Sequence, residues 1–251
     1  MTGGAVGRAL LRIATGAVLF FMYAPLALVI IYAFSDTGTS AWPPTSLSLK
    51  WLELAVALGA TAIALVLGSL AALAVARHAF FGREVVSFVL IFPIALPGIV
   101  TGMALSTTFA TVGLPLGVLA IIVGHATFCI VLVYNNVLAR LRRTAASQEE
   151  ASSDLGADSW QSFRFITLPA VRSAMLAGAL LAFALSFDEV IVTIFVAGGV
   201  KTLPIWIFQS FRLANQVSLV NVAGLVAILL SVVPVYIATR LTRDTGAIGR
   251  T

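Results

Sequence analysis

The side chains that could do chemistry fall into two groups, one inside apolar segments and one in a polar loop between them. Asp188 and Glu189 are consecutive acids midway along a long apolar segment. If that segment is helical, they point about 100° apart and together line a polar sector that suits a protonated amine. The alternative is that one acid pairs with a companion protein and only sets helix packing.

His125 lies in another apolar segment, and its role is open in the same way. It could line a substrate path, but a lone histidine on an apolar helix more often makes hydrogen bonds to a neighbouring helix. No second histidine or cysteine is spaced to share a metal ion with it, so we expect no metal site. The sequence also lacks GxxxxGK[ST] and any nucleophile elbow, which predicts a chain without catalytic activity and without a bound cofactor.

The composition indicates a membrane protein. Of 251 residues, 60% are hydrophobic and 10% are charged, whereas soluble domains are about 45–50% apolar and about 25% charged. Such a surplus cannot be hidden in one soluble core. This excludes a cytosolic enzyme, a disordered chain and a nucleic-acid-binding domain.

Six segments are long and apolar enough to cross a bilayer as helices. They predict an all-α integral membrane protein with one transmembrane domain over residues 1–251, and the spans cover 9–34, 53–76, 85–110, 115–138, 171–197 and 218–239. Pro93 and Pro97 should kink the third span. Small residues recur every four positions in the fifth, which predicts close helix contact along Ala174, Gly178, Ala182 and Ser186.

The basic residues orient these spans. Of fifteen lysines and arginines, only Lys50, Lys201 and Arg212 fall on one side of the predicted membrane. The positive-inside rule makes the other side cytoplasmic. We therefore expect a multi-pass protein with both termini in the cytoplasm.

The loop 139–170 is the most polar part of the chain, and it lies on the predicted cytoplasmic side. Ser147 with Glu150, and Asp158 with Gln161, have the spacing of helix-capping boxes. Gly156 suits the left-handed residue that ends a helix. The loop should thus hold two short helices, and Pro169 should open the next span from its first turn.

Apolar side chains stand out in this charged loop. They are Leu155, Trp160, Phe163 and Phe165, and aromatic residues surrounded by charge often anchor a protein interface. We expect Leu155, Trp160 and Phe163 to supply the apolar contact. The alternative is that Trp160 and Phe163 lie at the lipid headgroups as belt residues.

The same loop resembles a known motif. Glu150-Ala151-Ser152, Gly156 and Ile166-Thr167-Leu168-Pro169 follow the spacing of the EAA motif of ABC importer permeases, with Ser152 in place of the second alanine. In that family the motif forms the coupling helix that binds the ATPase subunit. The resemblance therefore implies that Glu150, Ala151, Gly156, Leu168 and Pro169 shape such an element.

Further segments resemble the C-type permease of bacterial spermidine/putrescine importers, among them 96–102, 124–128, 134–140 and 185–189. The resemblance implies a MetI-like type I fold in the bacterial inner membrane. It also implies partners: two ATPase subunits that use ATP and Mg²⁺, a second permease subunit, a periplasmic or lipid-anchored solute-binding protein, and membrane lipid, but no nucleic acid. Relatives usually carry more residues between the tryptophan that corresponds to Trp51 and the second span, which leaves open whether a helix along the outer surface is missing here.

The function predicted on this basis is import of a polyamine by alternating access. Another small nitrogen compound, such as an amino acid or an opine, is an alternative cargo. A self-sufficient secondary transporter is a further alternative, although such proteins usually show an internal repeat between their halves.

Overall fold

The computed structural model describes residues 13–17, 20, 48–145, 147–210 and 217–247, and the regular structure in these ranges is entirely helical. The predicted span 9–34 falls almost entirely outside them. The chain divides into two compact units, one of Met1–Pro44 with Ile207–Leu229 and the other of Thr45–Trp206 with Leu230–Thr251. The helices are α2 (Ser48–Arg77), α3 (Arg83–Ala95), α4 (Gly98–Thr111), α5 (Val118–Arg143), α6 (Ser147–Asp154), α7 (Ser159–Ser162), the π-helix η1 (Phe163–Thr167), α8 (Leu168–Phe187), α9 (Ile191–Val196), α10 (Leu203–Ser210) and α11 (Val217–Ala247).

Four helical stretches in the described ranges are long and apolar enough to cross a membrane. They are Leu52–Arg77, Val118–Arg143, Ser159–Phe187 and Val220–Arg240, and a bent pair formed by α3 and α4 adds one more candidate. These stretches coincide with five of the six predicted segments. The count of six spans stays a prediction.

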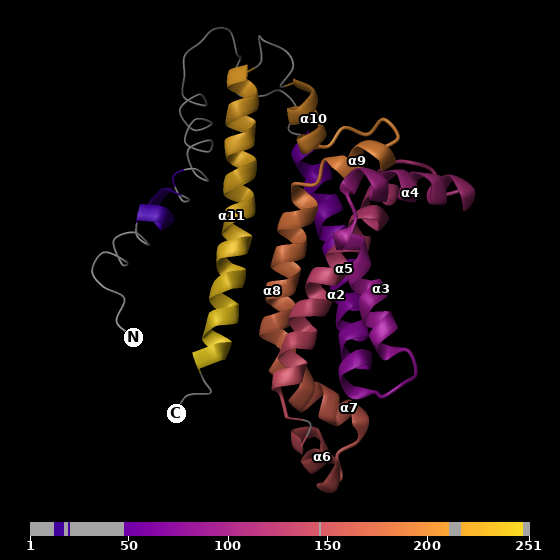
Figure 1. The fold of residues 1–251 in the computed structure, drawn as a ribbon, viewed down its shortest axis with the longest axis vertical. Helices are drawn as coiled ribbons and strands as arrows, with labels where there is room; N and C mark the ends of the chain where they lie inside the picture. The colour runs from indigo at the N-terminus through magenta and orange to yellow at the C-terminus, as the bar shows by residue number, and fades with distance from the viewer. Residues whose placement is uncertain (1–12, 18–19, 21–47, 146, 211–216, 248–251) are drawn as a thin grey trace. The chain divides into compact units, whose positions relative to one another are not determined.

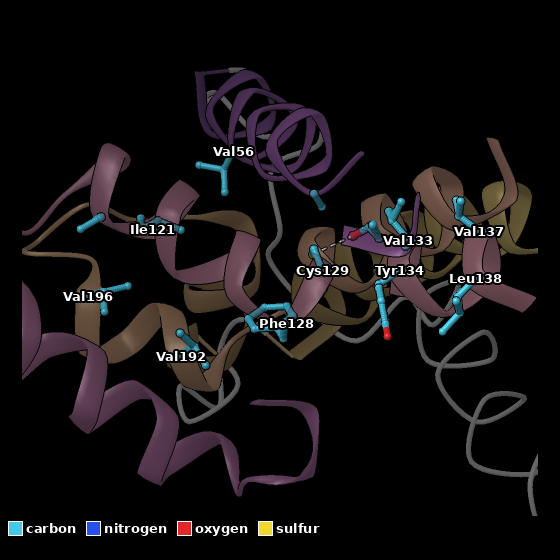
Figure 2. Packing of buried hydrophobic residues seen from close by; sticks show 14 of the residues in the cluster. Val56, Ile121, Phe128, Cys129, Val133, Tyr134, Val137, Leu138, Val192 and Val196 are labelled. Carbon is cyan, nitrogen blue, oxygen red and sulfur yellow. Dashed lines mark hydrogen bonds between the residues drawn. The ribbon is translucent and has the colours of Figure 1, made fainter. Parts of the chain in front are cut away.

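Helix α5 lies at the centre of the second unit. It packs against α2 and α8 along its length and contacts α3 and α9, and the three long helices run side by side in Figure 1. Its buried side chains, among them Phe128, Val133 and Tyr134, form the core drawn in Figure 2 together with Val56 of α2 and residues of α9. The Cys129 thiol donates to the carbonyl of Ala182 at 3.3 Å, which ties α5 to α8.

Two glycines bring the backbones of α2 and α8 close to α5 at the same level. A Cβ atom on Gly68 would lie 2.9 Å from the Ile130 carbonyl oxygen, and one on Gly178 would lie 2.9 Å from Val133 Cα. Any side chain at either position would therefore push the helices apart. The predicted contact stripe of α8 is confirmed, since its four small residues, Ala174, Gly178, Ala182 and Ser186, are all buried.

The third predicted span is not one kinked helix. It breaks into α3 and α4, whose axes differ by 108°. Leu96 adopts an extended conformation with ψ 143°, as expected for a residue before proline, and Pro97 has no amide hydrogen to continue the helix. Pro93 is accommodated inside α3.

The prediction that Asp188 and Glu189 lie midway along the fifth span is also wrong. Helix α8 ends at Phe187, and a new helix starts at Ile191. Asp188 is the C-cap of α8, with φ −102° and ψ 4°. The twenty residues of α8 rise about 30 Å, so the two acids lie near the end of the bundle that is opposite the polar loop.

The glycine contact can be tested by adding one methyl group. Gly178→Ala should lower the thermal unfolding midpoint of the purified protein, because the new Cβ atom meets backbone that cannot move freely; overpacking of this kind costs about 1–3 kcal/mol. Gly224→Ala is the matched control, since Gly224 is also helical but a Cβ atom added to it would have no neighbouring atom within 4 Å. Equal midpoints for the two variants would contradict this packing.

Candidate functional site

The polar loop folds as a helix, a glycine turn and a second helix, as predicted. Helix α6 begins at Ser147 and ends at a Schellman motif in which the amides of Gly156 and Ala157 donate to the carbonyls of Ser153 and Ser152, at 2.9 and 3.0 Å. Gly156 has a φ of +87°, which strongly favours glycine. Of the two predicted capping boxes, the one at Asp158 is confirmed: the Asp158 carboxylate accepts from the Gln161 amide at 2.8 Å, and the Gln161 side chain accepts from the Asp158 amide at 2.9 Å. Ser147 is instead the first residue of α6 rather than the residue before it.

The junction with α8 differs from the expected separate start of a span. The helix runs on from α7 through a π-helical turn, Phe163–Thr167, in which the Leu168 amide donates to the Phe163 carbonyl. Pro169 then stands in the first turn of α8. The wider π turn fits a segment followed by proline, because that residue supplies no hydrogen bond and its ring needs space next to the preceding turn.

The apolar residues of the loop divide into exposed and inward-facing ones. Leu155 and Trp160 are 89% and 63% exposed. Phe163 is half-buried and lies against Trp160, with ring centroids 5.6 Å apart. Phe165 is instead the second exposed aromatic residue of the loop, at 70%. The exposed apolar surface therefore consists of Leu155, Trp160 and Phe165. Phe163 packs against Trp160 on the side that faces the protein.

The motif residues of the loop lie around this surface. Glu150 and Ala151 are exposed on α6, Pro169 is exposed at the start of α8, and Leu168 is half-buried. The Ser152 and Ser162 hydroxyl groups are 2.6 Å apart, so the serine that replaces the second alanine of the motif joins α6 to α7.

An ion pair ties the loop to the membrane part, and sequence reasoning missed it. The Arg77 guanidinium at the end of α2 donates to Glu149 Oε1 from Nε and Nη2, at 3.1 and 2.9 Å. The Thr167 hydroxyl donates to the same oxygen at 2.8 Å. We call Arg77, Glu149 and Thr167 the clasp. It joins α2, α6 and the entry to α8, and no spacing in the sequence marks Glu149 rather than Glu150 for this role.

A cavity of about 540 Å³ lies beside the clasp. Its walls come from the end of α2, from α6 and from the α7–η1 segment, and include Leu70, His78, Ser153 and Phe163. The loop is thus held to α2 mainly through the clasp, with open space next to it.

At the other end of the bundle, the two acids have different environments. Glu189 Oε1 accepts from the Val192 amide at 3.0 Å, and the Glu189 carbonyl accepts from the Thr193 hydroxyl at 2.7 Å, so this residue caps α9. Asp188, in contrast, is exposed. Of the two acids among the predicted path residues, Asp188 is the one whose carboxylate does not accept from a helix amide.

The two helix breaks meet at this end. A Cβ atom on Gly98, just after the α3–α4 break, would lie 3.2 Å from Ile191 Cγ2, just after the α8–α9 break. Helices α4 and α9 pack together beyond this point. Asp188 therefore lies close to two interrupted helices. The last carbonyl groups of an interrupted helix have no hydrogen-bond donor within that helix and can accept from a ligand.

His125 lies between the helices near these breaks and is fully buried. Its Nδ1 is 2.8 Å from the Ser186 hydroxyl and its Nε2 is 2.8 Å from the Thr193 hydroxyl. The histidine thus bridges α5 to both α8 and α9, and this geometry favours the packing interpretation over a place in an open path.

Glu53 is a further acid that sequence reasoning treated only as the first residue of a span. It is 1% exposed and lies next to Thr202 and the backbone of Leu203. Across the residues that the structure describes, no group of three or more histidine, cysteine or acidic side chains could hold a metal ion.

The chain is similar to known transport proteins. Residues 64–246 match the family described as the binding-protein-dependent transport system inner membrane component. The putrescine transport system permease protein PotI of Escherichia coli K12 is 34% identical over 215 residues, which cover 77% of this chain and 76% of PotI. The spermidine/putrescine transport system permease protein PotC of Haemophilus influenzae is 30% identical, over 89% of this chain and 92% of PotC.

Solved structures share the fold. A bacterial ABC transporter involved in alginate import matches with a TM-score of 0.69 at 15% identity, covering 94% of both chains. The MetNI methionine ABC transporter matches with a TM-score of 0.65 at 18% identity, covering 82% of this chain and 99% of that one. With the family match spanning most of the sequence, this chain belongs to the inner-membrane components of binding-protein-dependent transport systems, the MetI-like permeases of ABC importers.

Proposed function

We propose that this chain is the membrane-spanning subunit of an ATP-driven importer that carries a polyamine across the inner membrane. The observation that carries the proposal is its similarity to PotI and PotC, which extends over most of each chain. The exposed carboxylate of Asp188 beside two helix breaks supports it, because an acid at such a place suits a cationic cargo.

In this proposal the loop α6–α7 is the coupling element. Leu155 and Trp160 insert into a groove of an ATPase subunit, and Glu150, Ala151, Gly156, Leu168 and Pro169 hold the element in shape. ATP and Mg²⁺ are bound by the two ATPase subunits and not by this chain. Closure of the ATPase pair moves the loop, and the clasp passes that movement to α2 and α8.

The rest of the assembly follows from the same proposal. A second permease subunit completes the path, a periplasmic or lipid-anchored binding protein delivers the cargo from outside, and both termini face the cytoplasm. ATP and the loaded binding protein shift the permease between inward-open and outward-open states.

The function is tested with the assembled importer in proteoliposomes. Uptake of radiolabelled putrescine should require ATP inside and the binding protein outside. Import of an amino acid or an opine without polyamine uptake would contradict the proposed cargo. Uptake by this chain alone, driven by an ion gradient, would contradict the whole assignment.

The same assay separates the roles of the two acids. Asp188→Asn should lower putrescine uptake about tenfold, the size expected when one hydrogen bond to a charged group is lost. Glu189→Gln should have a much smaller effect, because the amide oxygen can still accept from Val192 and cap α9. Equal losses in the two variants would argue against this division of roles.

The coupling surface is tested by placing charge on it. Leu155→Glu and Trp160→Glu should abolish co-purification with the ATPase subunits, since both residues are mostly exposed and their replacement leaves the fold intact. Phe81→Glu is the control, because Phe81 is a fully exposed apolar residue on the same predicted side but outside the loop. Normal ATPase binding by Leu155→Glu and Trp160→Glu would refute the proposed contact.

The clasp is tested by exchanging its charges. Arg77→Glu and Glu149→Arg should each uncouple ATP hydrolysis from uptake, and the double exchange should restore part of the coupling. Because both side chains are only 18% and 25% exposed, we expect a coupling energy of about 1 kcal/mol from the double-mutant cycle in unfolding measurements.

Asp154→Arg, an exposed acid on the same helix, provides the control for added positive charge on α6. Additive single effects, without any recovery in the double variant, would show that the ion pair does not transmit movement.

A further inference from the structure

Glu53 is an acid in a place where charge is costly. It lies near the start of α2, within the stretch long and apolar enough to cross a membrane, and only 1% of the residue is exposed. A buried carboxylate is usually held by a basic side chain or by several hydrogen bonds. A carboxylate without them requires a partner from elsewhere.

No basic side chain of the described residues forms an ion pair with Glu53. The Leu203 backbone and the Thr202 side chain lie against the Glu53 carboxylate. Its second oxygen, Oε2, and the Thr202 hydroxyl are nevertheless buried without a hydrogen-bond partner in the described chain. The ion pair found among the described residues joins Arg77 to Glu149 at the other end of the bundle. One carboxylate oxygen and one hydroxyl oxygen therefore lie side by side with unused hydrogen-bonding capacity.

Asp188 adds a second negative charge at the same place. It is close enough to Glu53 for the two carboxylates to repel each other. It is also the C-cap of α8, where the helix carbonyls give a further negative potential. The Glu189 carboxylate is engaged differently, since its Oε1 accepts from the Val192 amide at the start of α9. The result is a site rich in acceptors, and no described basic side chain, Lys201 next to Thr202 included, forms an ion pair with either acid.

We propose that Glu53 and Asp188 together bind one ammonium group of the cargo. Asp188, which is exposed, receives the ammonium first, and Glu53 with the Thr202 hydroxyl forms the inner wall of the site. An ammonium group has three N–H donors, which match the acceptors of these three side chains. This inference rests on the proposed function and adds Glu53 and Thr202 to the site of Asp188.

The segment Thr202–Leu203 covers Glu53 in this structure, so the ammonium reaches the inner wall when that segment moves during the transport cycle. Gly198 and Gly199, which precede this segment, have φ values of +56° and +93°. Residues other than glycine rarely adopt such a backbone conformation, so the turn before the segment requires glycine. The covering segment thus follows a sharp turn that lies within the same compact unit as both acids.

The test uses the complete importer in proteoliposomes, with radiolabelled putrescine as the probe. Glu53→Gln keeps the size of the side chain and removes its charge, and it should lower uptake about tenfold. ATP hydrolysis stimulated by the loaded binding protein should stay at the level of the unmodified importer, because the coupling loop is unaffected. Glu53→Asp, which retains the charge, should recover part of the uptake, an effect that a purely structural role would not produce.

Glu84→Gln is the matched control, since Glu84 is an exposed acid in the first turn of α3. Uptake by Glu53→Gln equal to that of this control would overturn the inference. Failure of Glu53→Gln to assemble or to keep its thermal unfolding midpoint would also overturn it, because the carboxylate would then serve folding. If the unmodified importer does not carry putrescine, the proposed function itself fails, so the two failures are distinguishable.

Discussion

The close approach of three helix backbones is the constraint on which the rest of the structure depends. Gly68 and Gly178 let α2 and α8 lie directly against α5 at the level of Val133. Hydrocarbon provides no hydrophobic force to hold helices together, so packing at such short range supplies much of the cohesion. The close approach makes α2, α5 and α8 one continuously packed bundle.

The two ends of the bundle carry different chemistry. At the predicted cytoplasmic end, the clasp joins α2, α6 and the entry to α8 through one carboxylate oxygen of Glu149. At the other end, α8 stops at Asp188, and α3 stops at Leu96. His125 lies between them and holds α5, α8 and α9 in register through both ring nitrogens. The clasp, the packed helices and His125 therefore form a continuous set of contacts between the polar loop and the acids.

Several local features followed from nearby residues alone. The capping box of Asp158 and Gln161, the left-handed turn at Gly156 and the buried stripe of α8 were predicted from side-chain chemistry and spacing. The placement of Asp188 and Glu189 was predicted wrongly, because hydropathy runs on without interruption through residues 171–197. Nothing in that pattern shows that the Glu189 carboxylate caps a new helix and so ends the old one.

Composition and the order of residues were enough to identify a helical membrane protein and its polar loop, and the resemblance of its motifs to known permeases indicated its family. Apolar length, charge placement and motif spacing are all properties of contiguous residues. Contacts between distant residues were not accessible in this way. Arg77 forms an ion pair with Glu149, which is seventy-two positions away in the sequence, and Glu53 lies beside Thr202 and near Asp188. Those pairings arise from how α2, α5 and α8 pack, and packing geometry depends on the whole bundle folding together rather than on any one segment.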